Sequence, residues 1–151
     1  MTLPPIEQLL PHRGMMLLLD RVAEFSADRT VAEYAPRHDA WYADARGNMP
    51  AWIGVELMAQ TIAAHVGLLK RDQGMPVAPG MLLGTRRYAA ARADFTAGRT
   101  LRIRANLSFR DESGLGAYDC AIEADGAQLA LATLKVFEPE DFQAFLREHG
   151  A

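Results

Sequence analysis

The chain has 151 residues, a net charge of −3 and one cysteine, and half of its residues are hydrophobic. This length suits a single domain over residues 1–151, and the composition is that of an ordinary globular protein. The Lys and Arg residues form no basic block, which argues against a nucleic-acid partner. Cys120 has no second cysteine to pair with, and the N-terminus lacks a signal-peptide pattern. We therefore expect a cytoplasmic protein in a reducing compartment.

The first 49 residues predict two strands followed by a long loop. Residues 5–9 are expected to form a short helical turn, residues 17–25 a strand, and residues 30–35 a second strand. Residues 36–49 (PRHDAWYADARGNM) are irregular and rich in Pro, Gly, Asp and Asn. A loop of this length is uncommon in a compact domain unless it has a function.

The stretch from Pro50 to Asp72 predicts the central helix. Pro50 suits the first position of a helix, and Glu56 is the only charged residue between Ala51 and Leu69. A helix that is hydrophobic all round is normally buried in the protein, so we expect Glu56 to be a buried carboxylate. We expect no membrane span, although the length would allow one, because Glu56, Gln60 and His65 would all lie in lipid.

The last third of the chain predicts antiparallel strands. Residues 81–88 are expected to form a strand, and apolar residues alternate with polar ones throughout 100–110. Residues 117–124 and 128–137 follow as two more strands, joined by a tight turn at Asp125-Gly126. A short terminal helix is expected over 138–148.

The order of these elements predicts an α+β fold, with one long central helix against a curved antiparallel sheet of about six strands. Such a sheet leaves an edge and a face to cover. Two-fold dimers are the commonest way to cover them.

Two sequence blocks resemble a known family. LPHRGMMLLLDRV (residues 10–22) and VELMAQ (residues 55–60) resemble blocks of the hotdog-fold β-hydroxyacyl-ACP dehydratases of the FabZ type. The approach to the helix, PAWIGVELMAQTIAAH, is similar in particular to the ApeP-type subunit of aryl-polyene biosynthesis. The resemblance implies a hotdog fold and dehydration of a 3-hydroxyacyl-ACP to the trans-2-enoyl thioester, in fatty-acid or aryl-polyene biosynthesis. It also implies an acyl carrier protein and a homodimer, or a heterodimer with a FabZ-like subunit, as partners. The phosphopantetheine of the carrier protein holds the substrate, and no metal or other cofactor is expected.

The resemblance also assigns roles to individual residues. Glu56 falls at the position of the general acid, and Gln60 lies one helical turn later, where it could hold Glu56. The Gly-His-Phe-Pro motif that supplies the base is absent, and its histidine position falls near Tyr42. His38 is the nearest histidine upstream and is the candidate base within the chain. His12 belongs to a Pro-His-Arg motif that is mainly architectural in the family.

Two further expectations concern substrate binding and the base. Free backbone amides of Ala51 and Trp52 at the helix start are expected to bind the thioester oxygen. Tyr42 is expected to be a third substrate-binding residue. The base is His38, or a histidine from a partner subunit, or it has been lost. A non-catalytic structural subunit and an acyl-thioester hydrolase remain as alternatives. The residues 10–22 and 55–60 favour a dehydratase over a hydrolase.

Overall fold

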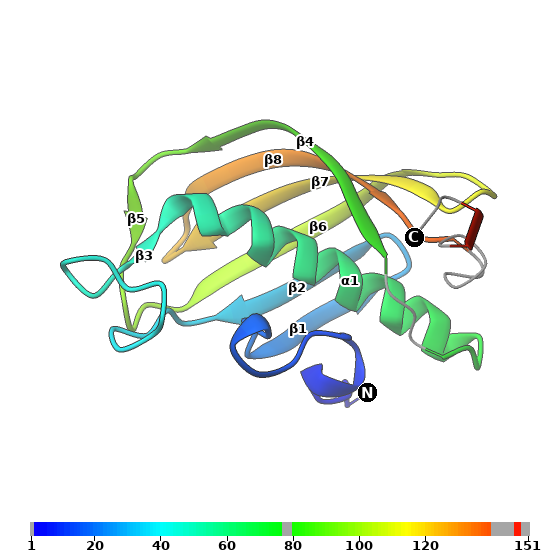
Figure 1. Cartoon of the computed structure of the whole chain (residues 1–151), viewed down its shortest axis with the longest axis horizontal. Coiled ribbons are helices and arrows are strands. Elements are labelled where there is room, and N and C mark those ends of the chain that lie inside the picture. The colour runs from blue at the N-terminus through cyan, green and yellow to red at the C-terminus, as the bar shows by residue number, and fades with distance from the viewer. Residues whose placement is uncertain (1, 77–79, 140–146, 149–151) are drawn as a thin grey trace.

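The computed structural model describes residues 2–76, 80–139 and 147–148, and within them one long helix lies across one antiparallel sheet (Figure 1). The helix, α1, spans Gly54–Asp72. The main sheet of the described part has six strands in the order β1-β2-β6-β7-β8-β4. Their bounds are Arg21–Ser26 for β1, Arg29–Tyr34 for β2, Met81–Ala90 for β4, Leu101–Arg110 for β6, Leu115–Ala124 for β7 and Ala127–Phe137 for β8. The predicted α+β arrangement is confirmed.

The alternation in β6 explains how the sheet packs. Leu101, Ile103 and Ala105 are buried on the side of α1, which contacts β6 more than any other strand. Arg102 and Arg104 point to the other face, where they form ion pairs with glutamates of β1, β2 and β7. One face of the sheet is therefore apolar and covered, and the other is charged.

The turn between β7 and β8 forms as predicted. Asp125 and Gly126 both have positive φ angles, 51° and 78°. Two left-handed residues in a row are typical of the tight hairpin turn that matches the twist of its strands.

The start of β1 differs from the prediction. Residues 14–16 form a short 3-10 helix, and the strand begins at Arg21 rather than at Leu17. The backbone amides of Leu18 and Leu19 point to the side chain of Gln60 on α1, with N–O distances of 3.0 and 3.4 Å. They are therefore unavailable to a neighbouring strand.

The start of the central helix also needs correction. Pro50 lies in a two-residue strand, β3 (Met49–Pro50), which pairs with β5 (Asp94–Phe95), and a 3-10 turn over Ala51–Ile53 precedes α1. This small sheet was not predicted, because two residues carry no periodic signal. Another short 3-10 helix, Ile6–Gln8, confirms the predicted turn near the N-terminus. The expected helix over 138–148 falls mostly outside the described residues.

Helix α1 is buried over most of its surface. Leu57 and Met58 are fully buried, whereas Val55, Glu56, Ala59 and Ala63 on one side are only half-buried, and Trp52, in the turn before the helix, is 69% exposed. The helix is long and apolar enough to cross a membrane by composition, but 61% of its apolar window is buried inside the protein. Burial to this extent is typical of a core helix. The half-buried side of α1 needs a separate explanation.

His65 is the polar residue at the centre of this core. It is fully buried, its Nδ1 lies 2.7 Å from Thr30 Oγ1, and its ring contacts the rings of Phe25 and Tyr118. His65 is therefore a histidine of the core, packed between two aromatic rings. Burial lowers the pKa of His65 to about 4.

We expect the protein to lose stability in acid through His65. Its pKa of about 4 when folded lies below the value of about 6.5 for an exposed histidine, so the unfolded chain binds more protons between these pH values. Going from pH 7 to pH 5 should therefore cost ~2 kcal/mol of unfolding free energy from this residue. Urea unfolding at both pH values measures it. His65→Gln should reduce the change in unfolding free energy between the two pH values, whereas His38→Gln, at an exposed site, should leave this change as it is in wild type. An equal change for wild type and His65→Gln would refute the assignment.

Gly67 marks a close contact between α1 and the N-terminal segment. A Cβ at this position would lie 2.7 Å from the backbone oxygen of Leu9. Alanine usually stabilises a helix by about 1 kcal/mol relative to glycine. We expect Gly67→Ala to destabilise the protein instead, by roughly 1–2 kcal/mol, because a backbone atom must move. Thermal unfolding tests this, with Gly84→Ala as the control, since a Cβ there meets nothing within 4 Å. A higher melting temperature for Gly67→Ala would contradict the packing.

Candidate active site

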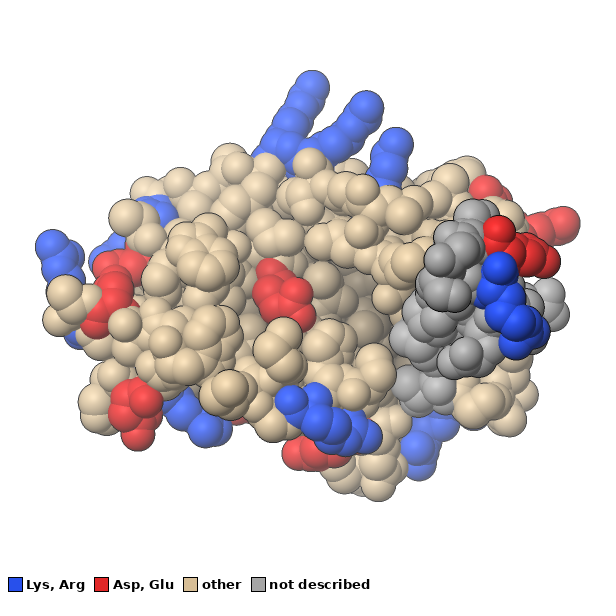
Figure 2. Space-filling view, in the orientation of Figure 1, with Lys and Arg blue, Asp and Glu red and all other residues tan. Residues whose placement is uncertain are grey.

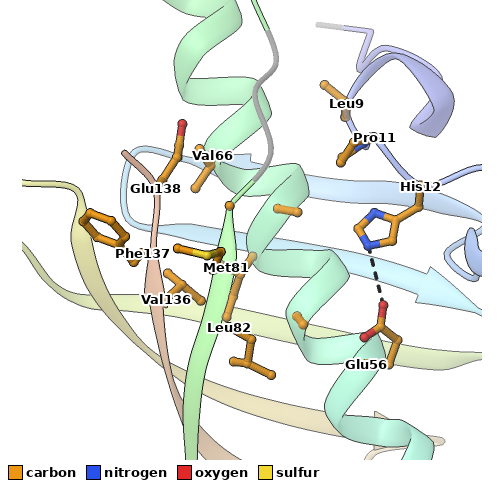
Figure 3. A pocket seen from close by; sticks show the side chains of 14 residues that line it. Leu9, Pro11, His12, Glu56, Val66, Met81, Leu82, Val136, Phe137 and Glu138 are labelled. Carbon is orange, nitrogen blue, oxygen red and sulfur yellow. Dashed lines mark ion pairs between the residues drawn. The ribbon is translucent and has the colours of Figure 1, made fainter. Parts of the chain in front are cut away.

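A pocket of about 230 Å³ lies beside the uncovered side of α1, between the N-terminal segment and the edge strand β4 (Figure 3). Most of its lining is apolar, and three residues with ionisable side chains also border it. The full lining is Leu9, Pro11, His12, Glu56, Ala59, Ile62, Ala63, Val66, Gly80, Met81, Leu82, Val136, Phe137 and Glu138. Figure 2 shows this face as a largely uncharged surface, hollowed beside α1, with acidic atoms near its centre. Such a pocket suits an apolar ligand that is held by a few polar groups.

Gln60 is the residue that organises the mouth of this pocket. Its side chain is fully buried, and its Nε2 donates hydrogen bonds to Met16 O at 2.6 Å and to Glu56 Oε1 at 3.0 Å. Its Oε1 accepts from the amides of Leu18 and Leu19. All four hydrogen-bonding positions of the amide are thus used. Gln60 therefore connects the segment before β1 to α1 and also holds the carboxylate of Glu56.

Glu56 faces His12 across the mouth of the pocket (Figure 3). The distance from Glu56 Oε1 to His12 Nε2 is 3.6 Å, which allows an ion pair but is long for a hydrogen bond. The other ring nitrogen of His12, Nδ1, is buried without a hydrogen-bond partner among the described residues. Two ionisable groups are therefore placed side by side next to an apolar cavity.

Glu56 is less buried than the sequence predicted. Its side chain is 41% exposed, so it is not a carboxylate sealed inside the protein. The prediction assumed that a helix apolar on all sides is covered on all sides. In this chain the side of α1 that carries Val55, Glu56 and Ala59 is only half-buried, and Glu56 and Ala59 line the pocket.

The expected oxyanion site at the helix start is also corrected. The amide of Ala51 donates a hydrogen bond to Ala93 O at 2.9 Å, so it is not free to bind a thioester oxygen. This bond continues the pairing of β3 with β5, which the sequence did not reveal. The ring of Trp52 is exposed and stands beside the Glu56 end of α1.

Tyr42 and His38 do not lie in the pocket. Tyr42 is buried, its hydroxyl lies 2.5 Å from the hydroxyl of Tyr34, and it accepts a hydrogen bond from the amide of Arg37. It therefore stabilises the 36–48 loop, and it does not line the pocket that contains Glu56. His38 is exposed in the same loop and does not line the pocket that contains Glu56. This chain does not bring His38 together with Glu56.

His12 is the site residue to which the sequence gave only an architectural role. Nothing in the spacing of His12 and Glu56, 44 positions apart, indicates that they meet. The bonds of Gln60 to Met16 and Leu18 hold the segment before β1 against α1, and Gly14 begins the short 3-10 helix of that segment with a positive φ of 60°. The sequence signal that could have pointed to His12 is the Pro-His-Arg motif to which it belongs.

Other reactive groups are scarce in the described part of the chain. Cys120 is buried in β7, and burial raises the pKa of its thiol to about 12, as expected for an inert core cysteine. No cluster of three or more His, Cys, Asp and Glu side chains among residues 2–76, 80–139 and 147–148 is suited to a metal ion.

Comparisons with known proteins decide the family. The profile of the ApeP-like family, described as ApeP dehydratase, matches residues 4–147. The chain belongs to this family. The comparison with curated proteins found no match.

Solved structures agree with this ApeP-like assignment. The dehydratase heterocomplex ApeI:P from Xenorhabdus doucetiae matches with a TM-score of 0.91 and 27% identity, over 99% of this chain and 100% of that one. The E. coli PaaI protein, from the phenylacetic acid degradation operon, matches at TM-score 0.61 and 15% identity, over 78% of this chain and 82% of that one. A hypothetical thioesterase with coenzyme A from Streptococcus pneumoniae TIGR4 matches at TM-score 0.60 and 13% identity, over 78% of this chain and 83% of that one. The last two show the fold alone, and together with the family they confirm the hotdog fold.

We expect Gln60→Leu to destabilise the protein by roughly 2–4 kcal/mol, because the Leu18 amide and the Met16 carbonyl lose their buried hydrogen-bond partner. Chemical unfolding measures this loss. Gln128→Leu, at an exposed position on β8, is the matched control and should change stability by less than about 0.5 kcal/mol. Equal effects of the two substitutions would show that the Gln60 hydrogen bonds do not support the fold.

Proposed function

We propose that this ApeP-like chain is a subunit of a dehydratase that converts a 3-hydroxyacyl thioester on an acyl carrier protein into the trans-2-enoyl thioester. The observation that carries the proposal is Glu56, held by Gln60 at the mouth of an apolar pocket in a chain of a dehydratase family. The acyl chain would enter the pocket, with its first carbons next to Glu56. The pathway we favour is fatty-acid or aryl-polyene biosynthesis in the cytoplasm. The phosphopantetheine arm carries the substrate, and no other cofactor takes part.

The reaction requires one proton donor and one proton acceptor. A base removes the proton from C2, the electrons form the C2–C3 double bond, and the hydroxyl on C3 leaves as water after it receives a proton. Gln60 occupies Glu56 Oε1, which leaves Oε2 to hold the proton for the leaving hydroxyl. Glu56 ends the step as a carboxylate, and the proton on the base restores it.

Two histidines are candidates for the base. His12 is favoured within this chain because its Nε2 lies 3.6 Å from Glu56. A histidine of a FabZ-like partner is favoured by the heterocomplex observed for ApeI:P in Xenorhabdus doucetiae. His38 is less favoured as the base than either of these, because it is exposed and lies outside the pocket.

The surface around Glu56 supports a partner subunit. The exposed large apolar residues Met15, Met16, Trp41 and Trp52 lie in the segments that precede β1 and α1. The outer side of β4 pairs with no strand of the described chain, and Leu82 and Leu83 are exposed there. Exposed apolar surface and an open strand edge are typical of a protein–protein interface. We therefore favour a heterodimer over a homodimer, with one site formed between the two chains.

The test follows 3-hydroxyacyl-ACP by mass spectrometry, with this chain alone and with a FabZ-like partner. Glu56→Gln should lower the rate of water loss roughly 10²–10⁴-fold, the usual contribution of a general acid. Glu112→Gln, which makes the same change in an exposed turn, should leave the rate unchanged. His12→Gln distinguishes the two bases, because it should abolish activity only if His12 removes the proton.

Three outcomes would contradict the proposal. Full activity of the complex with Glu56→Gln would mean that this chain is a structural subunit. Release of the free acid would indicate a thioester hydrolase. No change in the substrate with any partner would exclude the reaction.

A further inference from the structure

The open edge of the sheet carries two arginines that the described part of this chain does not neutralise. Arg86 and Arg87 lie in β4, the last strand of the sheet, and both are exposed. Together with Thr133 they line a hollow at this edge. Neither arginine forms an ion pair with any residue that the structure describes. Figure 2 shows basic side chains that stand out from the rim along which β4 runs in Figure 1.

Arginines on an inner strand of the sheet, in contrast, have counter-charges within the chain. Arg102 and Arg104 of β6 form ion pairs with glutamates of β1, β2 and β7. Within the described residues β4 has a neighbouring strand on one side only, where Arg86 lies opposite Thr133 of β8. A strand on the open side of β4 is therefore the element that could bring carboxylates to Arg86 and Arg87.

The open edge of β4 fits a β-strand better than it fits a helix. On this side the backbone N–H and C=O groups of β4 pair with no strand of residues 2–76 and 80–139. Leu82 and Leu83 of the same strand are 44% and 55% exposed. A partner strand pairs with the backbone groups and covers the apolar side chains, whereas a helix uses its own backbone groups internally and leaves the edge unpaired. These features favour the edge strand of a partner subunit as the occupant.

A second copy of this chain fits the edge poorly. Two-fold pairing of identical strands brings the residues at the middle of each strand next to their own copies. Arg86 lies at the middle of β4, so the two copies of Arg86 would be opposite or diagonal neighbours, and like charges at such positions are destabilising. The strand also has a bulge between Arg86 and Ala89, where Arg87 has a φ of 53°. Charges and bulges on an edge strand are a common means of preventing pairing with the wrong chain.

We propose that Arg86 and Arg87 determine which subunit pairs with β4. They exclude a second copy of this chain and select a partner whose edge strand carries Asp or Glu opposite them. This inference rests on the part of the proposed function that gives the chain a partner subunit, and it does not depend on the chemistry of Glu56. Leu82 of β4 lines the pocket, so the strand that is selected also closes the site.

The first test needs only this chain. Sedimentation velocity over a series of concentrations compares the wild type, the variant Arg86→Glu/Arg87→Glu and an equimolar mixture of the two. In the mixture each arginine faces a glutamate of the other copy, so the mixture should associate at least about 10-fold more tightly than either protein does alone. Equal association of the mixture and of the separate proteins would overturn the inference.

The second test measures binding to the FabZ-like subunit by titration calorimetry. Arg86→Glu/Arg87→Glu should weaken the complex by roughly 10- to 100-fold, because carboxylates of both chains then face one another. Arg71→Glu/Arg147→Glu, at exposed positions outside β4, makes the same change in net charge and should bind as the wild type does. Melting temperatures equal to that of the wild type show that the variants are folded.

The outcomes separate this inference from the proposed function. A complex that dehydrates the thioester but binds Arg86→Glu/Arg87→Glu as tightly as the wild type overturns the inference alone. A complex that shows the predicted loss of binding but leaves the thioester unchanged overturns the reaction and not the inference. If the substitutions weaken binding of the acyl carrier protein and not of the subunit, the two arginines serve the carrier protein and the inference is wrong.

Discussion

The hydrogen bonds of the Gln60 side chain are the interaction on which the rest of the site depends. One buried amide connects α1 to the backbone at Met16, Leu18 and Leu19, and it also holds Glu56. Because these amides bond to the helix, the first strand begins late and the segment before it folds over α1. That segment carries His12 to Glu56 and forms one wall of the pocket. Fold and site are thus determined by the same side chain.

The uncovered side of α1 is the second constraint. A helix with an apolar surface on all sides is stable in water only when all of it is covered. The sheet and the N-terminal segment of this chain cover most of α1, and the pocket lies on the remaining side, with the exposed Trp52 in the turn before the helix. The open edge of β4 lies beside the same pocket. Our proposal of a partner subunit accounts for both features at once, because a second hotdog chain would pair with the edge and close the pocket over Glu56.

The sequence predicted those features that rest on periodicity and on local turn chemistry. The alternation in β6, the turn at Asp125-Gly126 and the apolar run of α1 are patterns within short stretches, and each was found close to its expected position. The features that the sequence did not predict depend on contacts between distant segments of the chain. The pairing of β3 with β5 uses the amide of Ala51, and the packing of the loop buries the hydroxyl of Tyr42. Likewise, only the folded chain shows that His12, rather than His38, faces Glu56.

The most direct test of Glu56 as the proton donor is a structure of the complex with an amide-linked 3-hydroxyacyl analogue of the substrate. The amide lowers the acidity of the C2 proton, so the ligand should remain intact in the site. We predict that the C3 hydroxyl oxygen lies within about 2.6–3.2 Å of the Glu56 carboxylate, the distance a proton donor needs. A C3 hydroxyl that faces another acidic group, with Glu56 out of reach, would contradict the assignment of Glu56 as the proton donor.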